Sequence, residues 1–111
     1  MDKELFKDLL VGTYIRVYRE RPTATKLIKR IMKSTSVNVS HETARKWLMG
    51  TSTPSLEMVL ILEKTFNVPL ISHPVFEFEN LNESHLIAIR NQVNEKLNEL
   101  HRNNLGVNHG I

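Results

Sequence analysis

The side chains best suited to directed hydrogen bonding gather in one short segment. Five of its residues offer donors or acceptors, and two of these are cationic: His41, Glu42, Thr43, Arg45 and Lys46. The guanidinium group of arginine can donate two hydrogen bonds to the O6 and N7 atoms of guanine, and lysine binds phosphate as a point charge. These residue types therefore point to recognition of base edges and phosphates.

The same segment has the pattern of a short helix over 41–49. Ser40 is a good N-cap because its hydroxyl can accept from an amide of the first turn, and Gly50 suits the left-handed position past the end. The side expected to be buried consists of Ala44, Trp47 and Leu48, which recur at helical spacing. The polar side chains are then left on the remaining surface.

Each of these residues also has a plain structural interpretation. Trp47 lies on the apolar side, so we expect it to pack in the core rather than stack on a ligand. We expect Arg45 to contact a base and Lys46 a phosphate, although both could be inert surface charges. Glu42 could accept from cytosine N4 or only interact with the helix dipole. His41 could donate to a base or a phosphate, or simply be exposed.

Further contacts with a DNA backbone are predicted around this helix. A preceding helix over 24–33 would cross the DNA backbone and fix the register of the helix over 41–49. Besides the segment above, the residues predicted to touch DNA are Thr23, Thr25, Lys26, Lys29, Ser40, Thr51 and Ser52.

Positive charge is concentrated in the same part of the chain. Residues 16–46 carry nine Lys or Arg against two Asp or Glu, a net charge of +7. Residues 51–111 carry four against seven, a net charge of −3. Phosphate binding uses such concentrated charge, because each neutralised phosphate releases condensed counterions. Charge alone would equally fit a solvated basic surface, but its coincidence with the segment above favours nucleic acid.

The composition of the chain excludes several classes of protein. The chain has 111 residues, enough for one domain plus an appendage, and it is 41% hydrophobic and 24% charged. It has no cysteine, which excludes a disulfide framework and a thiolate metal site. No apolar run approaches the ~20 residues of a membrane span, and the first residues lack the pattern of a signal peptide. We therefore expect a cytoplasmic protein with no membrane partner.

Neither a metal site nor an active site is recognisable. The five histidines have no H-E-x-x-H or comparable ligand spacing: His41, His73, His85, His101 and His109. The chain also lacks a glycine-rich phosphate loop and a nucleophile with a base. We expect no metal, no cofactor and no enzymatic activity.

Hydrophobic periodicity predicts the helices that would position the segment over 41–49. The expected helices span 2–19, 24–33, 41–49, 54–66 and 81–102, with an enlarged turn over 34–38. Thr53 is the expected cap of the fourth helix, and Pro54 its first residue. Val75–Glu79 alternates apolar and charged residues as an edge strand would, and residues 106–111 form an expected disordered tail.

This arrangement resembles the lambda-repressor/Cro-like helix-turn-helix family. Eight positions match the family's recognition-helix pattern in one register without gaps: Val39, Ser40, Thr43, Trp47, Gly50, Pro54, Leu56 and Val68. The segment Thr23–Ile28 is similar to the opening of the family's second helix, and the resemblance covers roughly residues 5–70.

Three features depart from the family pattern. Leu48 stands where glutamate is common, and Ile28 replaces a usual small alanine. About six residues too many separate Leu27 from Val39, so the turn between the two helices must be enlarged.

The resemblance implies an all-α fold, with a compact four-to-five-helix lambda-repressor-like DNA-binding domain and an additional C-terminal helix. Residues 1–70 would form the helix-turn-helix domain, 71–80 a linker or short edge strand, and 81–111 the amphipathic helix with its tail. It further implies a phage or bacterial transcriptional regulator that binds a double-stranded operator as a homodimer. Such a protein is a repressor where the operator overlaps a promoter.

Two alternatives come from other classes. One is an antitoxin that binds its own promoter through the same module while its acidic C-terminal half neutralises a toxin. The other is a protein-interaction adaptor, such as a phage adaptor, whose basic face would meet an acidic partner. A protein partner of the chain would be a toxin or the transcription machinery.

An apolar stripe on the last helix is the candidate for dimerisation. Its residues recur at helical spacing: Leu86, Ile89, Val93, Leu97 and Leu100. The stripe could pair with a second copy, since readers of this kind usually work as two-fold dimers. Alternatively, it could fold back onto the same domain. Val75–Glu79 could also pair with its symmetry mate.

Overall fold

The first four helices each begin at a residue whose side chain caps the helix. The capping oxygens accept from a backbone amide two or three positions along the chain, at 2.9–3.3 Å, and belong to Asp2, Thr23, Ser40 and Ser55. The residues that end these helices are all left-handed: Arg19, Ser36, Gly50 and Asn67. Local chemistry therefore marks both ends of each helix.

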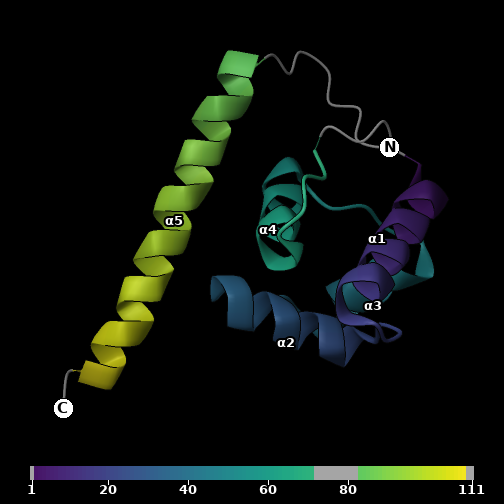
Figure 1. Ribbon diagram of the computed structural model, residues 1–111, viewed down its shortest axis with the longest axis horizontal. Coiled ribbons are helices and arrows are strands. Elements are labelled where there is room, and N and C mark those ends of the chain that lie inside the picture. Colours follow the sequence, from purple (N-terminus) through teal and green to yellow (C-terminus); the bar gives the residue numbers. More distant parts are fainter. Residues whose placement is uncertain (1, 72–82, 110–111) are drawn as a thin grey trace.

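The computed structural model describes residues 2–71 and 83–109, with side chains as far as residue 103. In these ranges the chain is all-helical and has no strand: α1 (Lys3–Tyr18), α2 (Ala24–Thr35), α3 (His41–Met49), α4 (Leu56–Phe66) and α5 (Glu83–His109) (Figure 1). The prediction of an all-α chain is confirmed at this level. The predicted strand Val75–Glu79 lies outside the described residues.

The predicted bounds of α3 are confirmed, but the end of α2 needs correction. α2 runs to Thr35, two residues past its predicted end, so that the turn covers residues 36–40 rather than 34–38. Thr35 is buried in the last turn, where its hydroxyl donates to the carbonyl of Ile31 at 2.7 Å and so has a partner.

The start of α4 was also predicted wrongly. Ser55, and not Thr53, caps the helix by accepting from the Met58 amide at 3.3 Å. Pro54 is buried just before the cap instead of opening the helix. Serine and threonine both cap well, so the residue types alone do not decide between Thr53 and Ser55.

α5 is longer than predicted. It continues to His109, so residues 106–109 are helical and do not form the expected disordered tail. α5 contains no proline, and its single glycine, Gly106, weakens a helix by only about 1 kcal/mol.

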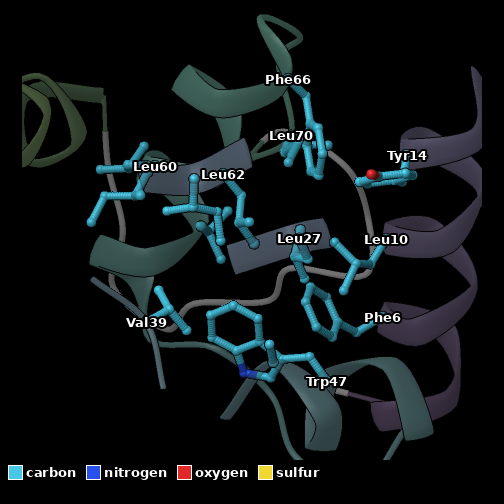
Figure 2. Close-up of a cluster of buried hydrophobic side chains, with 14 of the residues drawn as sticks. Phe6, Leu10, Tyr14, Leu27, Val39, Trp47, Leu60, Leu62, Phe66 and Leu70 are labelled. Atoms are coloured by element: carbon cyan, nitrogen blue, oxygen red, sulfur yellow. The ribbon is translucent and has the colours of Figure 1, made fainter. Parts of the chain in front are cut away.

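One hydrophobic core joins the helices. It is built around side chains that are at most 3% exposed, including Phe6, Leu10, Tyr14, Leu27, Ile31, Trp47, Leu62 and Phe66 (Figure 2). Each such burial contributes roughly 1.5–3 kcal/mol, so the core is the main stabilising element. It fixes α3 against α1 and α2.

α5 lies on one side of this body. It packs on α4 and α2 and, in the described residues, makes no contact with α1 or α3 (Figure 1). Val93 is buried in the core, while Leu86, Ile89 and Leu97 pack against it. No helix of the described part is both long enough and apolar enough to cross a membrane.

Candidate nucleic-acid interface

α3 is held by its inner side. Ala44 and Trp47 are 0% and 2% exposed, as predicted for the apolar side. The Trp47 ring stands at 87° to that of Phe6 on α1, with a centroid distance of 6.4 Å (Figure 2). Trp47 is therefore a core residue. This contact fixes which side of α3 faces outward.

The outer side of α3 carries residues predicted to contact DNA. Those that are exposed there are His41, Glu42, Arg45 and Lys46. Thr43 is half-buried, and its hydroxyl and its amide are both bonded to the Ser40 hydroxyl, at 2.8 and 3.1 Å. Ser40 and Thr43 thus close the start of the helix, and the four exposed side chains are open to a partner.

One carboxylate holds both cations of this outer side. Glu42 Oε2 accepts from Arg45 Nε at 3.2 Å, and Glu42 Oε1 accepts from Arg45 Nη2 at 2.9 Å. Lys46 Nζ lies 3.8 Å from the same Oε1. The third guanidinium nitrogen of Arg45, Nη1, donates to the sulfur of Met49 at 2.9 Å. The outer side is therefore an organised cluster of side chains.

This pair shifts both pKa values towards the ionised forms. The hydrogen bonds from Arg45 and its positive charge lower the pKa of Glu42. The hydrogen bonds to Glu42 and its negative charge raise the pKa of Arg45. Of the two roles considered for Glu42, its place in the first turn fits the helix dipole, and pairing with Arg45 adds a third role.

The predicted contact residues at the start of α2 are accessible. Thr25 and Lys29 are exposed, and no carboxylate of the described part lies within 4 Å of Lys29. Thr23 is exposed too, but its hydroxyl accepts from the Lys26 amide at 3.2 Å. The Lys26 ammonium lies 3.3 Å from Glu20. Lys29 is therefore more available to a phosphate than Lys26.

Glu20 gathers side chains from two helices. One of its oxygens accepts from the Tyr14 hydroxyl at 3.0 Å and from Arg30 at 3.2 Å, and the other accepts from Lys26 at 3.3 Å. These bonds, that of Tyr14 first, lower the pKa of Glu20. Arg30 also lies 4.0 Å from the centroid of the Tyr18 ring. The cluster joins α1 to α2.

Two predicted contact residues follow α3. The Thr51 hydroxyl is exposed but donates to the Lys46 carbonyl at 3.2 Å, and Ser52 is half-buried. Gly50 adopts φ +72°, and a Cβ placed there would stand 2.9 Å from a carboxylate oxygen of Glu4. This end of α3 is thus closed against α1.

The enlarged turn between α2 and α3 is anchored to the body. Val39 is buried in the core and Val37 packs against it. The Val37 amide also donates to the Thr35 hydroxyl at 3.2 Å. Ser36 takes the left-handed conformation that glycine usually supplies at the end of a helix. The extra residues therefore lengthen α2 and form a fixed turn.

Sequence reasoning missed several residues of this region. Arg16, Arg19 and Arg21 are exposed, and none has a carboxylate of the described residues within 4 Å. They lie within the basic segment 16–46, but they do not correspond to contact positions of the family pattern and were therefore not predicted. Met49, which contacts Arg45 and is 55% exposed, was missed because its apolar side chain signals burial.

The apolar stripe that was predicted to dimerise packs against the core of the same chain. Leu86, Ile89, Val93 and Leu97 pack on the chain's own core, which is the alternative arrangement considered above, and Leu100 is half-buried beyond them. Pairing with a second copy through this stripe stays a prediction.

No group of three or more His, Cys, Asp or Glu side chains in the described part is placed to hold a metal ion. No protein-family model, curated protein or solved structure matches this chain.

Proposed function

We propose that this chain is a sequence-specific transcriptional regulator that binds double-stranded DNA. In this proposal its first four helices form a lambda-repressor-like domain, and α3 enters the major groove. The observation that carries the proposal is the division of α3 into two sides. Ala44 and Trp47 fix the inner side to the core, while His41, Glu42, Arg45 and Lys46 lie outside.

The dimensions of α3 are compatible with this role. Its nine residues give a helix about 13.5 Å long, and an α-helix with its side chains is about 10–12 Å across. The major groove is about 12 Å wide and admits one helix. Because the inner side is buried, the first and second turns would meet the base edges with the exposed side chains.

Cations outside α3 would supply the attraction to phosphate. Within residues 16–33, five exposed cations have no carboxylate of the described residues within 4 Å: Arg16, Arg19, Arg21, Lys29 and Lys33. Each phosphate contact that they make would release counterions and add about −0.9 to the slope of log K against log salt. Binding to any duplex should therefore weaken steeply as salt rises.

The proposed working form is a homodimer on two half-sites about 34 Å apart. Because Val93 is buried in the chain's own core, pairing through the α5 stripe would require this packing to open, whereas pairing through another surface would leave it intact. Sedimentation of the full chain over a range of concentrations tests this assembly.

Selection of bound genomic fragments tests the proposed function. The purified chain is mixed with fragmented bacterial or phage DNA, and the recovered duplex, here called the cognate duplex, is compared with a scrambled one of equal length. We expect preference for the cognate duplex by at least about 10³-fold at physiological salt. Equal affinity for both duplexes would contradict sequence-specific regulation, and no binding to either would favour a protein partner.

A further inference from the structure

The bonds between Glu42 and Arg45 occupy one particular edge of the guanidinium group. Arginine has five N–H donors, arranged as a side edge of Nε and Nη2 and a terminal edge of Nη1 and Nη2. Glu42 takes the side edge through bonds of 3.2 and 2.9 Å. Among the described residues, the remaining contact of the terminal edge is with the sulfur of Met49, a weak acceptor that a stronger one can displace.

That terminal edge is a parallel pair of donors, which is what the O6 and N7 atoms of guanine require. A free arginine side chain populates many rotamers and must be ordered when it binds. The two bonds from Glu42 favour one arrangement of Arg45 in the unbound protein. The carboxylate therefore lowers the ordering that a base contact needs.

The same carboxylate has a second effect on its surroundings. Its negative charge lies beside Arg45 and 3.8 Å from Lys46 Nζ, well within one Debye length. This proximity weakens the attraction of both cations to phosphate, whatever the sequence of the DNA. Glu42 thus favours DNA binding in which Arg45 contacts a base, and it weakens DNA binding that depends only on attraction to phosphate.

We propose, on the basis of the function proposed above, that Glu42 is a positioning residue that sets the sequence discrimination of this protein. It acts through Arg45, which would make the base contact, and it does not need to touch DNA itself.

The test is the substitution Glu42→Gln, with Glu57→Gln as its matched control. Each glutamate stands two positions after a capping serine, Ser40 or Ser55, in the first turn of its helix. Both side chains are exposed, at 59% and 64%, and each lies within 4.0 Å of a lysine. The two variants therefore remove the same charge from equivalent helix positions.

Dissociation constants for the cognate and the scrambled duplex give the result. We expect Glu42→Gln to bind scrambled DNA about two- to fivefold more tightly and to lose about tenfold in the ratio of cognate to scrambled affinity. Glu57→Gln should change neither. In an Arg45→Ala background, Glu42→Gln should not lower the ratio further, because the residue it positions is gone. An unchanged ratio in Glu42→Gln overturns the inference.

A measurement without DNA separates this inference from the proposed function. In nitrogen-15 NMR spectra, the Arg45 Nε–H signal should be protected from exchange in the wild type and in Glu57→Gln, and lost in Glu42→Gln. Absence of that protection in the wild type contradicts the inference even if the protein binds its operator. Conversely, a wild type that keeps the protection but ignores DNA sequence contradicts the proposed function.

Discussion

Glu63 and Glu42 each bind an arginine, yet their surroundings differ. Glu63 on α4 is 13% exposed and accepts from the Leu70 amide at 2.9 Å and from Arg90 of α5 at 3.2 Å. Glu42 is 59% exposed and binds Arg45 three residues along the same helix. The first pair connects segments that are far apart in the sequence, while the second organises the surface of a single helix.

The difference separates residues that hold the fold from residues that are free to serve a partner. Removing Glu63 leaves a backbone amide and a cation without their acceptor at a junction of helices. Removing Glu42 leaves Arg45 in contact with solvent and leaves the buried side of α3 intact. Substitutions at the two sites should therefore alter different measurements.

The largest effect on stability is expected for Glu63→Ala. We expect the free energy of unfolding to fall by about 2–3 kcal/mol, because the Leu70 amide and Arg90 lose a largely buried charged acceptor. Urea denaturation measures the change. Glu42→Ala serves as the comparison and should leave the unfolding midpoint where it was. Equal losses in both variants would remove the distinction between the two pairs.

Arg45→Ala is expected to have the largest effect on recognition. Affinity for the cognate duplex should fall about tenfold or more through loss of one two-bonded base contact, with a much smaller change for scrambled DNA. Binding titrations of both duplexes measure the two losses. A matched fall on both would show that Arg45 contributes charge and not sequence reading.

Lys29→Ala should have a smaller and uniform effect. This exposed lysine would contact phosphate, so its loss should weaken every duplex alike and reduce the salt slope by about 0.9. Lys96→Ala is the control, because that side chain lies on α5 and is 73% exposed. If Lys96→Ala reduced the slope as much, α5 would have to belong to the interface.

The smallest effect is expected from acid. The pKa of Glu20 in the folded chain is lowered from its ordinary value near 4.5 by bonds from Tyr14, Arg30 and Lys26. Its contribution to stability is therefore complete above about pH 4.5 and is lost as the pH falls through the lowered pKa. Glu20→Gln should flatten this acid limb of the stability curve. An acid limb that keeps its slope in the variant would rule out this contribution.

Much of the proposed DNA-contacting region could be predicted because its determinants are local. Ser40, Gly50 and the apolar spacing of Ala44 and Trp47 fix α3 within eleven residues, and the structure confirms its bounds. The start of α4 was missed because Thr53 and Ser55 are both competent caps, and local sequence does not select between them.

Contacts between distant segments could not be predicted from one sequence. Nothing local marks Glu63 as the partner of Arg90, 27 residues away. The inward direction of the α5 stripe likewise depends on the surface that α4 and α2 present to Val93. By contrast, the three-residue spacing of Glu42 and Arg45 could have indicated their pairing, since such neighbours meet on one helix face.

The central claim is that α3 reads base edges in the major groove, and replacing single guanines by 7-deazaguanine in the cognate duplex tests it most directly. This change removes the N7 acceptor from the major groove and leaves the minor groove as it was. We expect one such replacement to weaken the wild type about tenfold and to leave Arg45→Ala unaffected. If no replacement in the major groove weakens binding, or if Arg45→Ala responds as the wild type does, α3 is not the reader.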